Sequence, residues 1–159
     1  MNLKQKTFFI LSLMALIGAN AFAESEVNLG SDGIAVSGYD VVSYFKGAQP
    51  LKGSTQFQAK EGGATYLFAT DADRQEFTKN PGHYVPQFGG WCAYAVAKSK
   101  SKVEVDPQSF LIQDDRLLLF YKGFWGDTRE KWLHTQDKDS KTYLKEADTY
   151  WPAIRGSKP

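Results

Sequence analysis

The chain contains a single cysteine, Cys92, and this excludes any disulfide within the molecule. A fold without a covalent staple depends on the burial of its apolar side chains. Aromatic residues make up 14% of the chain, which favours a dense core over disorder. Cys92 is therefore expected to be either a side chain sealed in that core or a free thiol with a chemical role.

The N-terminal residues have the three-part layout of a secretory signal peptide. Lys4 and Lys6 form a positive start, residues 8–17 form an apolar run, and Ala21 and Ala23 are small residues at the positions that a signal peptidase reads. The apolar run is shorter than the roughly 20 residues that a membrane-spanning helix needs. We predict cleavage after Ala23, a periplasmic or secreted protein, and no membrane anchor on the remaining chain.

The remaining chain, residues 24–159, has the length of one domain. Loss of Lys4 and Lys6 changes its formal charge from +1 to −1, and both signs are dispersed along the sequence. This pattern provides no electrostatic footprint for nucleic acid, and the one basic cluster, residues 98–102, is most simply a solvated loop. A small ligand, a metal ion or a protein remain as partners.

The apolar periodicity predicts an α+β fold. Alternating residues predict two β-hairpins, at 57–68 around a Gly-Gly turn and at 110–121. The second hairpin has a continuous apolar run, which is typical of strands covered on both faces. Helical signals lie at residues 40–45, 70–77, 91–97, 125–133 and 143–154. We therefore predict a small antiparallel sheet built from the two hairpins, covered by several short helices and a C-terminal helical pair.

Four segments of the sequence resemble the YHS-domain family, specifically its small exported bacterial members. They are residues 38–45 (GYDVVSYF), 63–68 (GATYLF), 77–84 (FTKNPGHY) and 86–93 (PQFGGWCA). The resemblance covers about residues 33–151 and implies a YHS-like domain. Related modules are attached to copper- and mercury-handling proteins and are thought to bind a transition metal through several cysteines. This chain has only Cys92, so the resemblance supports the fold more than the metal role.

A mixed metal site remains as one hypothesis for the function. Cysteine, histidine and carboxylate ligands together can hold copper, zinc or another transition metal. The candidate ligands are Cys92, His83, Asp40 and Asp106. Each also has a structural interpretation: Cys92 as a small buried side chain, His83 as a surface or capping residue, Asp40 as a helix N-cap, and Asp106 as a turn residue before Pro107.

A small-ligand pocket and a thiol-dependent enzyme are the other hypotheses. Aromatic and glycine residues gather around the cysteine and could line a pocket or belong to the core: Tyr84, Phe88, Gly89, Gly90, Trp91 and Tyr94. A thiol-dependent redox or transfer enzyme would use Cys92 as its nucleophile, with His83 or His134 as a base. His134 is expected to be exposed. Since no oxyanion-hole or phosphate-loop motif accompanies the cysteine, we favour a binding protein over an enzyme, with a structural or partner-binding domain as the further alternative.

Overall fold

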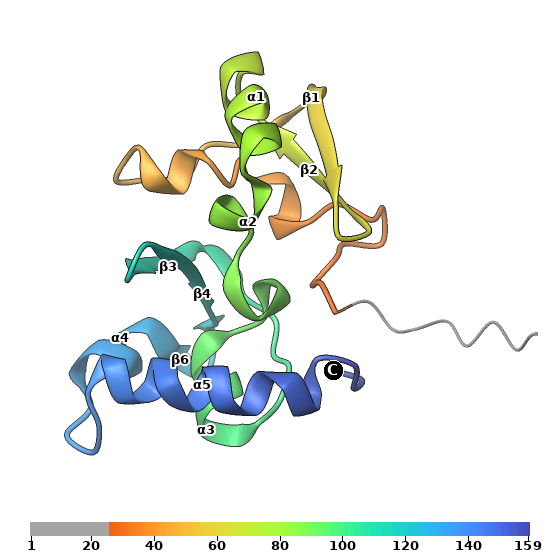
Figure 1. The fold of residues 1–159 in the computed structure, drawn as a ribbon. Coiled ribbons are helices and arrows are strands. Elements are labelled where there is room, and N and C mark those ends of the chain that lie inside the picture. Colours follow the sequence, from red (N-terminus) through yellow and green to blue (C-terminus); the bar gives the residue numbers. More distant parts are fainter. Residues whose placement is uncertain (1–25) are drawn as a thin grey trace, which may run out of the picture.

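The computed structural model describes residues 26–159, which form an α+β fold as the sequence predicts (Figure 1). The predicted signal peptide, residues 1–23, lies outside the described residues. The first elements are two 3₁₀ helices, a hairpin and two α-helices: η1 (Val36–Gly38), η2 (Ser43–Phe45), β1 (Ser54–Glu61), β2 (Ala64–Phe68), α1 (Asp71–Lys79) and α2 (Pro81–Tyr84). The later elements are η3 (Gln87–Gly90), α3 (Ala93–Ser99), β3 (Asp106–Gln113), β4 (Arg116–Phe120), β5 (Lys122–Gly123), β6 (Gly126–Asp127), α4 (Thr128–His134) and α5 (Ser140–Ile154).

Both predicted hairpins form, and each makes its own two-stranded antiparallel sheet. β1 pairs with β2 through a turn in which Gly62 and Gly63 adopt φ values of 56° and 81°. These left-handed values suit glycine because it has no side chain. β3 pairs with β4, and a third short pair, β5 with β6, follows within the described residues. The hairpins are therefore joined by packing and not by a continuous hydrogen-bonded ladder.

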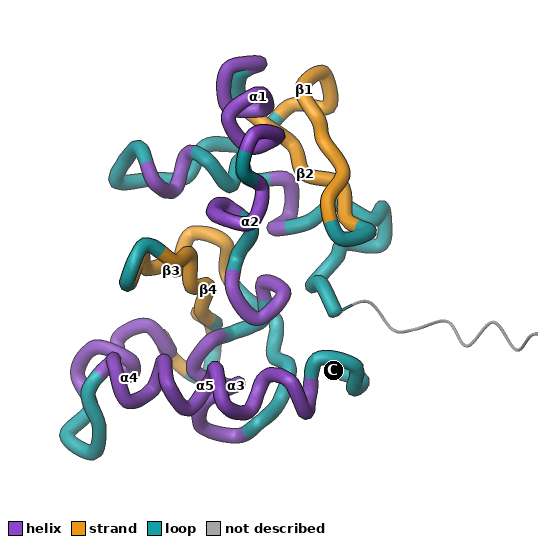
Figure 2. Tube along the Cα trace, in the orientation of Figure 1, coloured by secondary structure: helices purple, strands orange, loops and turns teal. Residues whose placement is uncertain are grey.

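Strand β4 separates two hydrophobic cores. Because side chains alternate along a strand, Leu117 and Leu119 enter one core while Leu118 and Phe120 enter the other. The first core also takes side chains from the first hairpin and α1, and the second takes side chains from α3, α4 and α5. Figure 2 shows the three later helices gathered at one end of the molecule and the first hairpin at the other. The predicted burial of this strand on both faces is confirmed.

The start of α1 agrees with the helical signal predicted from residue 70. The Thr70 side chain accepts a hydrogen bond from the Asp73 backbone N–H at 3.1 Å and caps this helix. The apolar stripe of α5 is confirmed, because Tyr143, Leu144 and Ala147 are buried. Within residues 26–159, no helix combines the length and the apolar character that crossing a bilayer requires.

One local expectation is wrong, and a second holds only in part. Trp125 does not share a helical face with Trp132, because residues 123–126 form the turn between β5 and β6 and α4 starts only at Thr128. Asp106 forms an Asx turn by accepting the Gln108 N–H at 2.9 Å, but this turn lies within the first residues of β3. A shift in the β3–β4 register between Asp106 and Phe110 accommodates the proline, which cannot donate to the ladder.

A charged network joins η2 to α1 and predicts a loss of stability in acid. The Lys46 ammonium lies 2.6 Å from a carboxylate oxygen of Asp73 and 2.6 Å from one of Glu76, and the Tyr84 hydroxyl donates to Glu76 at 2.6 Å. These hydrogen bonds from Lys46 and Tyr84 lower the pKa of Glu76 below its usual 4.5. A carboxylate with a lowered pKa stabilises the folded state above its usual pKa, and this contribution disappears as the pH falls through the lowered value.

We therefore expect Glu76→Gln to reduce the pH dependence of stability on the acid side. The free energy of unfolding, measured by denaturant titration at about pH 7 and about pH 3, should differ less between the two conditions in Glu76→Gln than in the wild type. Glu61→Gln, at the exposed end of β1, is the matched control and should keep the wild-type difference. Equal pH dependence in both variants would contradict a role for the Lys46–Glu76–Tyr84 contacts.

Candidate functional site

Cys92 is a buried, hydrogen-bonded residue that immediately precedes α3. Its exposed fraction is 0%, and its Sγ lies 3.3 Å from the Thr128 hydroxyl and accepts a hydrogen bond from the Tyr121 backbone N–H at 3.4 Å. The Thr128 hydroxyl donates its hydrogen to the Tyr121 carbonyl at 2.9 Å. It therefore receives the thiol hydrogen of Cys92 through a lone pair. This geometry matches the structural interpretation of Cys92.

The other candidate metal ligands have separate partners. His83 packs against the rings of Phe45 and Tyr84, and its Nδ1 lies 3.4 Å from a carboxylate oxygen of Asp115. Asp106 accepts a hydrogen bond from the backbone N–H of Gln108 at 2.9 Å. His134 is exposed on α4, as expected, and lies 3.4 Å from Glu130.

Asp40 holds the backbone of the first core together. Its side chain is completely buried and accepts hydrogen bonds from the backbone N–H groups of Val42 at 2.9 Å, Ser43 at 3.3 Å and Ala69 at 2.8 Å. Burial raises the pKa of Asp40, and the hydrogen bonds from Ala69 and Val42 oppose that rise. The carboxylate therefore makes cap-like hydrogen bonds, although the predicted helix at 40–45 is reduced to η2, whose N-cap residue is Val42. It also ties the end of β2 to the segment before η2.

A transition metal does not fit the four candidate ligands as the structure arranges them. No three histidine, cysteine, aspartate or glutamate side chains among residues 26–159 come close enough to hold an ion. Cys92 is surrounded by hydroxyl and backbone groups, while the Asp40 oxygens are occupied by N–H donors. His83 likewise has its own aromatic and acidic neighbours. We derive no metal chemistry from these residues.

The six predicted pocket residues are distributed over different parts of the surface. Phe88 and Gly89 line one cavity, Gly90 lines a second, and Tyr94 lines a third together with Cys92. Tyr84 donates to Glu76, and the buried Trp91 donates from its ring nitrogen to the Glu26 carbonyl at 3.1 Å. The sequence cluster therefore serves several purposes, and only Phe88 and Gly89 line the cleft between the two cores.

The left-handed backbone of η3 lets this segment lie against residues 26–28 near the start of the described chain. Phe88, Gly89 and Gly90 all adopt left-handed φ values, of 55°, 60° and 81°. A side chain at Gly89 would collide with the Glu26 carbonyl, and the Gly89 carbonyl accepts a hydrogen bond from the Asn28 N–H at 2.7 Å. Phe88 is not a glycine, so its left-handed conformation is uncommon and carries strain. This conformation places the Phe88 ring beside α5.

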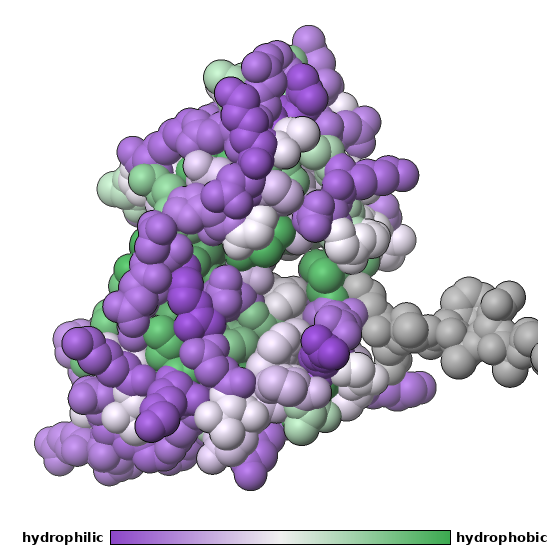
Figure 3. All heavy atoms as spheres, in the orientation of Figure 1, coloured by the Kyte–Doolittle hydropathy of each residue, from purple (hydrophilic) through white to green (hydrophobic). Residues whose placement is uncertain are grey.

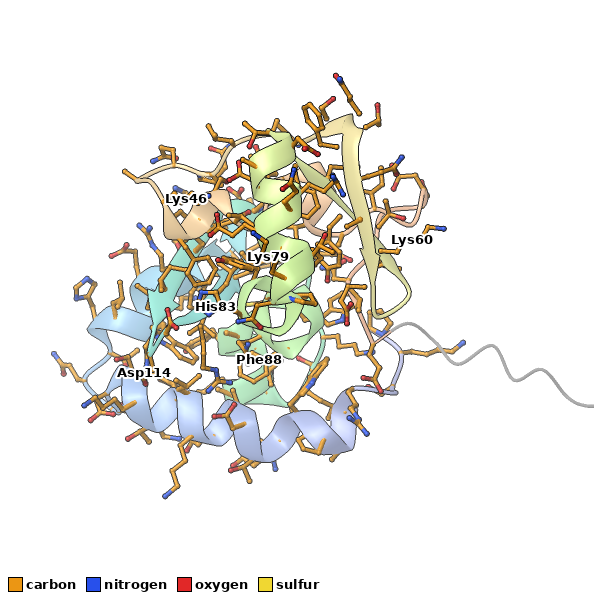
Figure 4. All side chains as sticks on the ribbon, turned by 45° about the horizontal axis from the view of Figure 1, so that its top comes forward. Lys46, Lys60, Lys79, His83, Phe88 and Asp114 are labelled. Carbon is orange, nitrogen blue, oxygen red and sulfur yellow. The ribbon has the colours of Figure 1, made fainter. Side chains whose placement is uncertain are left out.

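Phe88 lies at a cleft of about 350 Å³ between the two cores. In Figure 4 its side chain lies just above α5, and its ring centroid is 6.1 Å from that of Trp151. Apolar side chains, coloured green in Figure 3, gather at the waist between the two halves of the molecule. The lining combines aromatic, polar and charged residues from the segment before η1 and from β1, β2, η3, β4 and α5: Glu26, Glu61, Tyr66, Gln87, Phe88, Arg116, Asp148 and Trp151.

The charges around this cleft are predominantly negative. Arg116 is the one cation of the lining, and it donates to both carboxylate oxygens of Asp148, at 2.9 and 2.6 Å, and to Gln87 at 2.8 Å. The Asp148 contact raises the pKa of Arg116, which stays charged. Glu26 and Glu61 add two further carboxylates, of which Glu26 is paired with Arg155 at 3.4 Å. Thus Asp148 neutralises the guanidinium, Glu26 has a cationic partner of its own, and Glu61 adds a negative charge to the lining.

Sequence reasoning found Phe88 and Gly89 but missed the opposite wall of the cleft. Arg116, Asp148 and Trp151 lie far from η3 in the chain and come together only because α5 packs beside β4 and η3. Compared with known proteins, the chain matches no family model, no curated protein and no solved structure.

Proposed function

We propose that this chain is an exported, non-enzymatic binding protein of the YHS type that holds a small ligand in the cleft between its two cores. The observation that carries the proposal is the cavity of about 350 Å³ in which Phe88, Trp151 and Tyr66 form aromatic walls beside charged groups. Small-molecule sites commonly combine apolar walls with a few polar groups and have volumes from about 300 Å³ upward. The α+β fold is compatible with the family resemblance.

The state of the polar groups supports binding and not proton transfer. Burial, with a further contribution from Glu61, raises the pKa of Tyr66 to about 12, so its hydroxyl stays protonated at neutral pH. Arg116 and Asp148 are held as an ion pair with two hydrogen bonds. A general acid or base works best when its pKa lies near the working pH. These groups instead keep fixed charges, which suits the recognition of a ligand.

The charge of the lining favours a ligand with a positive group on an apolar body. Glu61 attracts a cation, and the Trp151 ring stabilises one through its quadrupole, whereas Glu26 is already paired with Arg155 and the Phe88 ring already faces the Arg116 guanidinium. An anion would meet the Glu61 carboxylate, while the guanidinium of Arg116 is already engaged by Asp148. The chemical class that fits is therefore a compact organic ammonium compound.

Calorimetric titration with benzyltrimethylammonium tests this proposal. We expect it to bind more tightly than neopentylbenzene, its uncharged isostere, and more tightly than benzoate. Trp151→Ala should weaken binding by about tenfold or more, since an aromatic face contributes about 1–2 kcal/mol to holding a desolvated cation. Glu61→Gln, at an exposed position, should weaken it less.

The matched control is Trp125→Ala, which removes an exposed tryptophan that does not line the cleft. It should leave the affinity unchanged. No binding of any of the three compounds would contradict a small-ligand site of this kind. Equal affinity for the ammonium compound and its neutral isostere would contradict the ligand class and leave the apolar cleft as the binding element.

A further inference from the structure

The turn between β5 and β6 exposes two large aromatic side chains next to each other. Phe124 is 90% exposed and Trp125 is 76% exposed, although side chains of this size are usually buried in folded domains. Their rings make an edge-to-face contact with centroids 5.0 Å apart. The pair is therefore a preformed apolar tip that nothing in residues 26–159 covers.

Hydrogen bonds hold this tip in place. The Trp125 backbone N–H donates to the Tyr121 hydroxyl at 3.3 Å, and the Lys131 ammonium donates to the Trp125 backbone carbonyl at 3.4 Å. The Tyr121 hydroxyl lies so close to Gly123 that a side chain there would collide with it. Because these contacts already order the backbone of the turn, binding through the aromatic pair loses little further conformational entropy.

An apolar cavity of about 190 Å³ continues the tip inward. It lies beside Trp125 and is lined in part by the side chains of Tyr94, Val103 and Tyr121. None of its lining residues belongs to the cleft between the cores. The aromatic pair and this cavity therefore form a second apolar surface, which is independent of the proposed ligand site.

Positive charges surround the same surface. Lys98 lines the cavity, Lys122 lies on β5, and Lys131 contacts the backbone of the tip. All three lysines are exposed. The acidic residue of the hairpin, Asp127, lies 3.8 Å from the Lys122 ammonium and caps α4 by accepting the Arg129 backbone N–H at 2.9 Å, so its own side chain is largely withdrawn from solvent. Glu130, in the next turn, is paired with Arg129 and His134.

We propose that this tip docks onto a lipid bilayer that carries anionic headgroups. Tryptophan is favoured at the bilayer interface because its ring has an apolar body and a polar N–H group. Trp125 and the wholly apolar ring of Phe124 would be buried there together. Lysines close to an anionic membrane surface add favourable electrostatic energy, which matches the positions of Lys98, Lys122 and Lys131. A convex aromatic tip needs no shaped receptor in a bilayer, whereas a protein partner would have to supply a complementary hollow.

Vesicle flotation with the exported, processed protein tests this inference. The wild type should float with vesicles of phosphatidylcholine containing phosphatidylglycerol and far less with pure phosphatidylcholine. The double variant Phe124→Ser with Trp125→Ser should lower the partition coefficient by about tenfold or more. The double variant Lys98→Gln with Lys122→Gln should lower it several-fold and weaken its dependence on salt.

Leu51→Ser is the matched control, because it removes a side chain that is 54% exposed and lies outside the tip. It should float like the wild type, and all variants should keep the wild-type unfolding midpoint because the substituted side chains are exposed. Absence of wild-type flotation, equal flotation with neutral vesicles, or an unaffected Phe124–Trp125 variant would each overturn the proposal. Self-association that the same variant abolishes, without vesicle binding, would replace the bilayer with a second copy of the chain.

Discussion

Replacement of Asp40 by alanine is expected to destabilise the protein by about 3 kcal/mol or more, although Asp40 lies in neither proposed binding surface. The completely buried carboxylate accepts backbone hydrogen bonds from Val42, Ser43 and Ala69. Alanine would leave the N–H groups of Val42 and Ala69 without this acceptor, while Ser43 keeps its hydrogen bond to the Asp40 backbone carbonyl at 3.1 Å. An unsatisfied buried donor costs about 1–3 kcal/mol. Denaturant unfolding at neutral pH measures the loss.

Two variants distinguish this structural role from a role in metal binding. Asp40→Asn keeps one acceptor oxygen and should lose less stability than Asp40→Ala. Asp106→Ala removes the other aspartate proposed as a ligand, but that residue makes one hydrogen bond at the edge of β3 and should cost less than about 1 kcal/mol. A wild-type stability that rises with added Cu²⁺ and loses this rise in both alanine variants would contradict the structural interpretation.

The thiol of Cys92 is expected to react with a thiol reagent at least about a thousandfold more slowly in the native protein than in the unfolded chain. The side chain is 0% exposed, and its sulfur is bonded to Thr128 and to the Tyr121 backbone. A reagent therefore has to wait for an opening of the structure, and openings of a buried core residue are rare because they cost several kcal/mol. Spectrophotometric labelling with an aromatic disulfide, with and without denaturant, measures the ratio.

A chain that combines Cys92→Ala with Lys98→Cys is the matched control for labelling. Lys98 is exposed on α3, the helix that follows Cys92, so the control thiol should react at the rate of a free thiol without denaturant. If native Cys92 reacted as fast as this control, the buried-thiol interpretation would be wrong and a thiol-dependent activity would regain support. Cys92→Ala itself should cost about 1–2 kcal/mol through lost packing and hydrogen bonding.

The elements that the sequence predicts well are those whose signals are local. The Gly62–Gly63 turn sets the first hairpin because both positions need left-handed backbone, and Thr70 sets the start of α1 because its hydroxyl reaches an N–H three residues later. The continuous apolar run of β4 is also a local pattern, and it predicts burial of this strand on both faces. The position of Trp125 was predicted wrongly, because apolar spacing at 3.6 residues can arise in a turn followed by a helix.

The candidate site depends instead on contacts between distant segments. The proximity of Cys92 and His83 in the sequence suggested a shared site, but the chain sends Cys92 towards Thr128 and His83 towards Asp115. The wall of the cleft opposite Phe88 comes from α5, more than fifty residues later in the chain. Periodicity predicts that α5 has an apolar face, but it carries no information about which surface that face covers.

The sequence by itself determined that no disulfide can staple the chain, that two hairpins form, and that several helix termini are capped, because each depends on residue type or on neighbours within a few positions. Tertiary structure alone decided that Cys92 is buried and that the predicted metal ligands lie apart. It also decided that Phe88 faces Trp151, and that Phe124 and Trp125 are left exposed. The reason is that burial and proximity are properties of the packed chain, where side chains far apart in sequence compete for the same two cores.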